Sequence, residues 1–299
     1  MTKCLHDSYA VGADIGGSHI CSAVVNLTKG TICTEPIITM SDCNASASAI
    51  LDTWQNNIAS TIRHFGNKIC NVGLAIPGPF DYINGISLIR GVNKYDNIYG
   101  LNVKLSLSDR LRDAGVRNIK FVNDASAFAL GESLGGAGSD RHRIVALTLG
   151  TGVGSGFVLD RHLVENGEEV PPNGWVYNLP FENGIADEAF STRWICRRYY
   201  ELTGTCITGA KEVSELCASD DCAKKLFEEY GKRLATFAYP LLKRFSSDTL
   251  LLGGNISKAH HHFGTSLTQT FESLGYKVDV RISTLLDKAA LIGSASLFI

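Results

Sequence analysis

Two glycine-rich turns are the features of this sequence with the clearest chemical meaning. One, at 16–18, follows the apolar segment 9–15, and the other, at 150–152, follows the apolar segment 143–149. Glycine lets the backbone approach an anion closely, so successive N–H groups of such a turn can bind phosphate. A single turn is equally typical of a plain hairpin connection, but two at matching places favour phosphate. The candidate phosphate-binding residues are Gly16, Gly17, Ser18, Gly150, Thr151 and Gly152.

Two aspartates stand where apolar segments end. Asp14 lies beside the first turn and could hold Mg²⁺, through water because Mg²⁺ keeps most of its waters. It could also bond the backbone of its own turn. Asp124 follows Asn123 at the point where a strand at 120–122 gives way to a helix at 125–134. A carboxylate there is either a helix N-cap or a general base, and the local sequence favours neither.

The elements that must position these groups repeat in the two halves of the chain. Each half opens with strand, glycine turn and strand, and each has a later buried strand that ends in a turn. Pro240 should kink or break the helix that contains it. The expected strands are 9–15, 20–27, 31–40, 72–76, 143–149, 155–159 and 249–252. The expected helices are 50–66, 187–202, 222–245, 267–274 and 287–298.

This repetition predicts a duplicated α/β fold of two lobes with a cleft between them. The length of 299 residues fits two domains. We expect an N-terminal α/β lobe at 1–123 and a C-terminal α/β lobe at 124–286, with a C-terminal helix at about 287–299 returning to the first lobe.

Composition excludes several classes of protein. Lys and Arg number 28 against 30 Asp and Glu, so no basic nucleic-acid footprint is expected. No run of 18 apolar residues is present, so no membrane span is expected, and the N-terminus shows no secretory signal. Nine cysteines without a C-x-x-C pair indicate a reduced, cytoplasmic chain.

Together, these residues resemble the ROK family of sugar kinases and repressors, within the actin-like ATPase superfamily. The resemblance runs over most of the chain, in the family's order. Its segments are a first phosphate motif at 11–18, a P-G-P segment at 75–79, an N-D-A block at 122–132, a second phosphate motif at 147–154 and an adenosine motif at 250–257. The resemblance implies two actin-like (ribonuclease H-like) lobes with an interlobe cleft.

The resemblance also implies roles for particular residues. Asp124 would be the catalytic base, ATP the phosphoryl donor, and Mg²⁺ the metal beside Asp14. Further ATP contacts would come from the adenosine motif, at Gly253, Gly254 and Asn255. Sugar contacts would come from Asn93, Asn123, Asp124, Asn178 and Glu188.

Departures from the family pattern carry their own expectations. The family's zinc-binding cysteine cluster is missing, so no zinc is expected. Trp175 and Asn178 stand where the family has a sugar-contacting Glu and a His, and His19 stands where a Lys often follows the first phosphate motif. The segment 94–96 departs from the family's L-P-G-W. Three adjacent histidines at 260–262 cannot all face one ion, so a surface run is expected there.

The sequence therefore predicts an ATP-dependent hexose kinase that acts on a 6-hydroxyl, with glucose as the first candidate and N-acetylated hexosamines and fructose next. A homodimer is expected, with no nucleic-acid or membrane partner. One alternative is a sugar- or nucleotide-binding protein with weak or no activity, suggested by the altered 175–178 segment. A DNA-binding repressor is disfavoured because eight residues before the first strand are too few for a helix-turn-helix domain.

Overall fold

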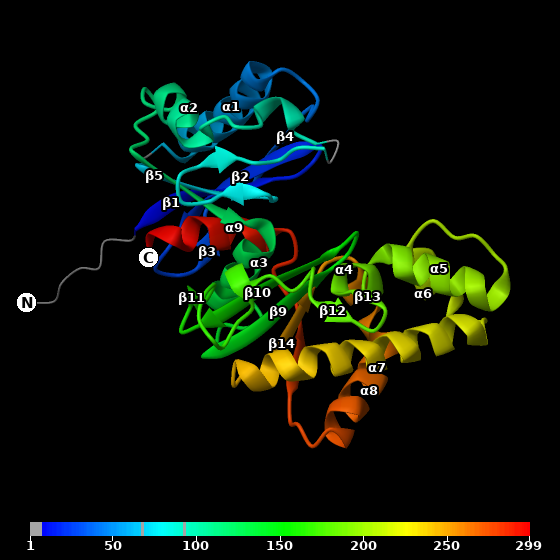
Figure 1. The fold of residues 1–299 in the computed structure, drawn as a ribbon. Coiled ribbons are helices and arrows are strands. Elements are labelled where there is room, and N and C mark those ends of the chain that lie inside the picture. The colour runs from blue at the N-terminus through cyan, green and yellow to red at the C-terminus, as the bar shows by residue number, and fades with distance from the viewer. Residues whose placement is uncertain (1–7, 67–68, 92–93) are drawn as a thin grey trace, which may run out of the picture. The chain divides into compact units, whose positions relative to one another are not determined.

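The computed structural model describes residues 8–66, 69–91 and 94–299 (Figure 1). The chain packs into two units, one of Met1–Gly135 together with Asp287–Ile299, and one of Gly136–Leu286. The sequence placed the boundary at 123/124, twelve residues earlier than this. The difference is α3 (Asp124–Gly135), which packs against α9 (Lys288–Ala295) and so stays with the first unit.

The first unit is built on one mixed sheet in the order β3-β2-β1-β5-β8, with β4 also pairing with β2. β1 and β2 form an antiparallel hairpin, whereas β1, β5 and β8 run parallel. The carboxyl ends of those three strands therefore meet at one edge. The strands are β1 (Tyr9–Ile15), β2 (His19–Asn26), β3 (Thr31–Ile32), β4 (Ile37–Met40), β5 (Asn71–Ile76) and β8 (Asn118–Asn123).

The second unit repeats this plan with a sheet in the order β11-β10-β9-β14-β15. β9 and β10 form the antiparallel hairpin, and β14 and β15 continue parallel to β9. The predicted duplication of an α/β unit is therefore confirmed. The strands are β9 (Arg143–Leu149), β10 (Val153–Leu159), β11 (His162–Leu163), β14 (Thr249–Gly253) and β15 (Asp279–Ile282).

The remaining elements are helices and two small hairpins. The helices of the first unit besides α3 and α9 are α1 (Ala47–Phe65) and α2 (Val103–Arg110), with short 3₁₀ turns at Asp96–Ile98 and Ser296–Phe298. Those of the second unit are α4 (Ala186–Ala189), α5 (Thr192–Thr203), α6 (Ala210–Leu216), α7 (Asp221–Arg244) and α8 (His260–Ser273), with 3₁₀ turns at Pro172–Gly174 and Ile256–Ala259. The small hairpins are β6 (Phe80–Asp81) with β7 (Ile86–Ser87), and β12 (Pro180–Phe181) with β13 (Gly184–Ile185).

The C-terminal helix α9 is part of the first unit's core. It contacts β1, β5 and α3, as Figure 1 shows in red beside blue and green elements. A side chain at Gly12 of β1 or Gly73 of β5 would overlap the backbone of α9, so these glycines let the helix lie directly on the sheet. This close packing fixes β1, whose carboxyl end carries Asp14, and β5, which lies between β1 and β8.

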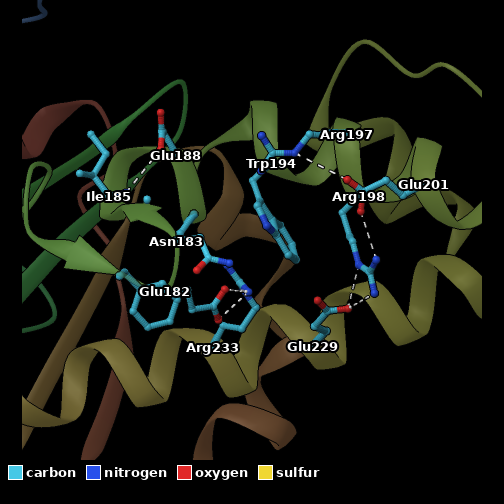
Figure 2. Close-up of a pocket in the computed structure, with 13 residues that line it drawn as sticks. Glu182, Asn183, Ile185, Glu188, Trp194, Arg197, Arg198, Glu201, Glu229 and Arg233 are labelled. Atoms are coloured by element: carbon cyan, nitrogen blue, oxygen red, sulfur yellow. Dashed lines mark hydrogen bonds and ion pairs between the residues drawn. The ribbon is translucent and has the colours of Figure 1, made fainter.

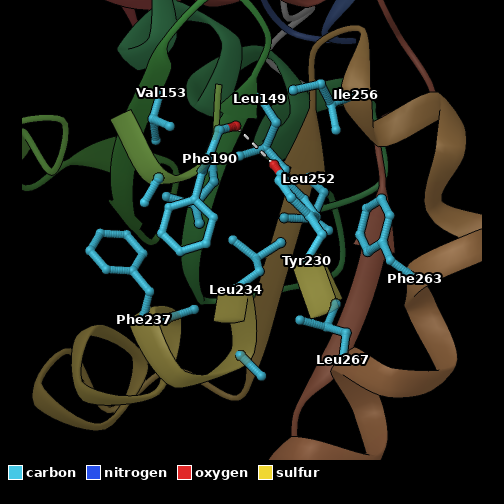
Figure 3. Close-up of a cluster of buried hydrophobic side chains, with 14 of the residues drawn as sticks. Leu149, Val153, Phe190, Tyr230, Leu234, Phe237, Leu252, Ile256, Phe263 and Leu267 are labelled. Atoms are coloured by element: carbon cyan, nitrogen blue, oxygen red, sulfur yellow. Dashed lines mark hydrogen bonds between the residues drawn. The ribbon is translucent and has the colours of Figure 1, made fainter. Parts of the chain in front are cut away.

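The core of the second unit is aromatic (Figure 3). Tyr230 of α7 is fully buried and donates a hydrogen bond from its hydroxyl to the carbonyl of Phe190 at 2.9 Å. Phe263 of α8 packs edge-on against the Tyr230 ring, with centroids 5.3 Å apart. A buried tyrosine needs a partner for its hydroxyl, so this contact fixes Phe190 between α4 and α5.

Two expected elements are divided in the structure. The expected strand 31–40 is interrupted between β3 and β4, where Pro36 has no N–H to donate to the sheet. The expected helix 187–202 breaks at Phe190 and Ser191 into α4 and α5. The N–H of Thr192 donates to the carbonyl of Gly150 at 2.8 Å instead of continuing the helix.

Two other helices are longer than expected. α7 runs through Pro240 without the predicted break. Pro240 and Thr236 are exposed, so the carbonyl that loses its helical partner can bond water. α8 begins at His260 and not at Leu267, so the histidine run opens the helix. In the described part of the chain, no helix is long and apolar enough to cross a membrane.

Candidate functional site

Asp14 and Asp124 belong to the same edge of the first unit's sheet. Asp14 of β1 pairs with Ala75 of β5, and Ala75 pairs with Val122 of β8, two residues before Asp124. One strand therefore separates the two aspartates at the carboxyl ends of parallel strands. Ligand-binding residues of open α/β sheets gather at this edge.

The residue before Asp124, and not Asp124 itself, caps the helix that follows. α3 begins at Asp124, and the Asn123 side-chain oxygen accepts the N–H groups of Ala125 at 3.0 Å and Ser126 at 3.4 Å. Asn123 is thus the residue that caps the helix. Asp124 Oδ1 accepts a hydrogen bond from the Ala125 N–H at 2.9 Å, and the residue is exposed. The carboxyl is therefore not needed to cap the helix.

The surroundings of this edge raise the pKa of both carboxyls. Burial, with smaller contributions from Asp124 and Asp287, raises the pKa of Asp14 to about 7. The pKa of Asp124 is also raised, because protein around its carboxyl displaces bulk water even though the residue is exposed at its surface. Hydrogen bonds to the Asp124 carboxyl and the charge of Lys94 oppose this rise. A carboxyl with a raised pKa is suited to accept a proton.

Hydrogen bonds of Gly16 hold the first glycine turn in place. Two further N–H groups of the turn remain without an acceptor among the residues that the structure describes. Gly16 donates to the His19 carbonyl at 2.9 Å, and the Gly16 carbonyl accepts the Tyr95 hydroxyl at 2.5 Å. Within the described residues, no acceptor takes the N–H groups of Gly17 and Ser18. Two adjacent free N–H groups in a fixed turn are what an anion site needs.

The second glycine turn is held by residues that the sequence did not single out. Gly150 donates to the Gly152 carbonyl at 3.0 Å, and Asp187 Oδ1 accepts the Val153 N–H at 2.8 Å. The N–H groups of Thr151 and Gly152 have no acceptor in the part of the chain that the structure describes. This turn therefore has the same free donors as the first.

The Gly253–Asn255 segment lies beside this second turn within the same unit. β14 runs parallel to β9, with Gly253 opposite Thr148. Gly254 has a left-handed φ of 80°, and a side chain there would overlap the backbone of Leu149. The three predicted ATP contacts of this segment thus share one sheet edge with Gly150, Thr151 and Gly152.

Glu188 faces different surroundings from its neighbour Asp187. It lines a cavity of about 540 Å³, and its Oε2 lies 3.4 Å from the Ile185 N–H, which donates to it. Figure 2 shows its carboxylate pointing away from Arg198 and Arg233, which also line the cavity. The two arginines are already paired, with partners Glu182, Glu201 and Glu229. Asp187 and Glu188 are adjacent carboxylates in the sequence, and only the folded structure shows that their surroundings differ.

The other residues predicted to contact sugar are Asn178, Asn123 and Asn93. Asn178 is exposed, and the Asn123 amide donates to the Tyr82 hydroxyl at 3.2 Å. The prediction for Asn93 lies outside the described residues. Asp287 was not predicted, because nothing in its local sequence links it to Asp14.

The arrangement of His, Cys, Asp and Glu side chains limits which metal ions the chain could hold. Among the described residues, no group of three or more His, Cys, Asp or Glu is arranged to hold a metal ion. In the histidine run, the His262 ring packs on Phe227 with centroids 5.5 Å apart, and the His260 ring packs on Phe263. Asp14 still fits a water-mediated Mg²⁺, because a cation there would stabilise a carboxylate whose pKa is raised by burial and, to a smaller extent, by Asp124 and Asp287.

Comparison with known proteins gives a consistent result. A model of the ROK family matches residues 10–299. The chain is 28% identical over 269 residues to a glucokinase of Thermotoga maritima, with 80% of this chain and 83% of that protein covered. It is 27% identical over 287 residues to an N-acetyl-D-glucosamine kinase of Salmonella heidelberg, with 88% of each covered.

The fold is similar to a crystal structure of a ROK family glucokinase from Streptomyces griseus in complex with glucose and AMPPNP. The TM-score is 0.73 at 22% identity, covering 97% of this chain and 99% of that one. This similarity confirms the expected α/β, actin-like fold.

Proposed function

Because the chain belongs to the ROK family, we propose that it is an ATP-dependent sugar kinase, which transfers the γ-phosphoryl group of ATP to a hexose hydroxyl. The observation that carries this proposal is the state of Asp124. The helix is capped by Asn123, the Asp124 residue is exposed, and burial of its carboxyl raises its pKa. Such a residue is suited to accept the proton of a hydroxyl nucleophile.

The glycine turns would stabilise the transferring group. The free N–H groups of Gly17, Ser18, Thr151 and Gly152 can donate to phosphoryl oxygens as charge develops there. Phosphoryl transfer depends mostly on such positioning and charge stabilisation. Gly253, Gly254 and Asn255 would contact the rest of the nucleotide.

Asp14 would hold Mg²⁺ through water. The ion would neutralise charge on the phosphate oxygens of ATP. Binding a cation would also keep the Asp14 carboxyl ionised at neutral pH, where burial and the nearby carboxylates otherwise raise its pKa to about 7.

The sugar would be bound by Asn123, Asp124, Asn178 and Glu188, with Asn93 as a further candidate. Glucose and N-acetylglucosamine are the first candidates, since relatives at 25–28% identity carry these names, and fructose follows. The 6-hydroxyl is the proposed acceptor. The proposal includes the cytoplasm, where ATP is available, and a homodimer, with no nucleic-acid or membrane partner.

The proposal is tested by identifying the phosphorylated products of the reaction. Protein, MgATP and glucose or N-acetylglucosamine are incubated, and ³¹P NMR records the products. A sugar 6-phosphate signal that appears with ADP supports the proposal, and the 6-deoxy analogue of the active sugar should give none. Binding of a sugar without any phosphorylated product would instead favour the alternative of a binding protein with weak or no activity.

A further inference from the structure

The Lys94 side chain lies directly over the first glycine turn. A methyl group at Gly17 would lie 3.0 Å from Lys94 Cε and 3.2 Å from Lys94 Nζ. The ammonium group thus lies beside Gly17, in the turn whose Gly17 and Ser18 N–H groups have no acceptor among the described residues. The first glycine turn therefore combines unpaired backbone donors with a nearby cation.

The neighbouring residue explains why Lys94 stays there. Tyr95 is fully buried with a φ of 57°, and its ring packs edge-on against Trp54 with centroids 5.4 Å apart. Its N–H donates to the Cys43 carbonyl at 3.0 Å and its hydroxyl to the Gly16 carbonyl at 2.5 Å. A non-glycine residue with positive φ is held by its surroundings, so Tyr95 anchors Lys94 to the turn.

The charge of Lys94 is available to a ligand. In the described part of the chain, Lys94 makes no ion pair, and the residue is exposed. Its positive charge nevertheless acts on Asp124, where it opposes the rise in pKa that burial causes. The ammonium group is therefore close enough to influence the proposed base without being neutralised by it.

We propose that Lys94 binds the terminal phosphoryl group of the nucleoside triphosphate through transfer. This inference rests on the proposed function. In the step, the sugar oxygen forms a bond to phosphorus, and the bond between phosphorus and the bridging oxygen of ADP breaks. The hydroxyl proton goes to Asp124, and Lys94 stays protonated throughout. Its ammonium donates to phosphoryl oxygens that also accept the Gly17 and Ser18 N–H groups.

The proposal separates triphosphate from diphosphate binding. Affinities of the full chain for AMPPNP and for ADP, each with Mg²⁺, are measured by calorimetry without sugar, so no turnover occurs. Lys94→Met should weaken AMPPNP roughly tenfold or more, the usual effect of losing a charge-assisted hydrogen bond, and leave ADP within about twofold. Lys94→Arg should recover most of the AMPPNP affinity.

Lys104→Met is the matched control, because Lys104 is a half-buried lysine of the same unit, on α2, that donates to the Ile83 carbonyl. It should leave both affinities unchanged. Equal AMPPNP affinity in wild type and Lys94→Met overturns the inference, as does an equal loss for both nucleotides. If no sugar is phosphorylated by wild type while Lys94→Met loses AMPPNP selectively, the kinase proposal fails and the role of Lys94 stands.

Discussion

Asp187 Oδ1 accepts the backbone N–H of Val153 at 2.8 Å, and this bond ties α4 to the second glycine turn. Asp187 Oδ2 is paired with Arg193 of α5 at 2.8 Å, so both oxygens of the carboxylate have partners. Thr192, at the start of α5, donates to Gly150 from both its N–H and its hydroxyl. Asp187 of α4 and Thr192 of α5, on either side of the break between these helices, therefore hold the turn that would bind phosphate.

Substitution of Asp187 should affect the nucleotide and not the sugar. Asp187→Ala removes the acceptor of the Val153 N–H, which should lower the free energy of unfolding by about 1–3 kcal/mol and raise the KM for ATP. The sugar KM should stay close to that of wild type. Steady-state kinetics with each substrate varied in turn, together with thermal denaturation, measure these effects.

Glu188→Gln should have the opposite kinetic effect. Loss of a charge-assisted acceptor for sugar hydroxyls should raise the sugar KM roughly tenfold or more and leave the ATP KM nearly unchanged. Glu215→Gln, an exposed carboxylate on α6 paired with Lys211, is the control and should change neither constant. If Glu188→Gln lowers thermal stability alone, Glu188 serves only the start of α4. A sugar effect in Asp187→Ala instead would move the role to Asp187.

Asp124→Asn should fold normally and lose most of its turnover. The amide oxygen can still accept the Ala125 N–H, and Asn123 keeps its capping bonds, so melting should stay near that of wild type. The amide cannot take a proton, which should lower kcat about 10²- to 10⁴-fold. Turnover within a few-fold of wild type would show that Asp124 is not the base.

The sequence predicted those parts of the site that lie within short segments. Both glycine turns and Asp124 directly follow their strands, and Asp14 is the next-to-last residue of β1, so local pattern was enough to single them out as candidates. Tyr95 reaches Gly16 across 79 residues of sequence, and Asp187 reaches Val153 across 34. Such pairings are set by packing, which a single sequence does not display. The predicted break at Pro240 was wrong for the same reason. Whether a helix can continue through a proline depends on whether the carbonyl that loses its partner faces solvent, and the sequence does not show which face of α7 is exposed.

Asp14 should make wild-type stability depend on pH. Its folded-state pKa of about 7 exceeds the ordinary value of 3.8, so between these values the folded chain holds a proton that the unfolded chain has lost. Stability from this group is therefore present below about pH 4 and is lost as pH rises towards 7. Asp14→Asn should melt above wild type at pH 8 and close to it at pH 4.

The control for this prediction is Asp113→Asn, an exposed carboxylate of the same unit, whose melting curve should run parallel to that of wild type. Added MgCl₂ should raise the melting temperature of wild type at pH 8 more than that of Asp14→Asn, because the ion offsets the charge on Asp14. Equal pH dependence in wild type and Asp14→Asn would contradict the assignment.

Purified protein should hold no stoichiometric zinc after exhaustive dialysis. The family's cysteine cluster is missing from the sequence, and His260 and His262 pack against phenylalanine rings. Elemental analysis measures the content directly. One zinc per chain would overturn the prediction and direct attention to Cys217, Cys222 and the histidine run.

The most direct test of the kinase assignment is ADP release coupled to NADH oxidation, measured with MgATP and a panel of hexoses and amino sugars. We predict that at least one hexose with a free 6-hydroxyl raises ADP release far above the rate without sugar, and that Asp124→Asn abolishes this increase in the same assay. If the protein binds AMPPNP but no sugar in the panel raises its rate of ADP release, the assignment is contradicted.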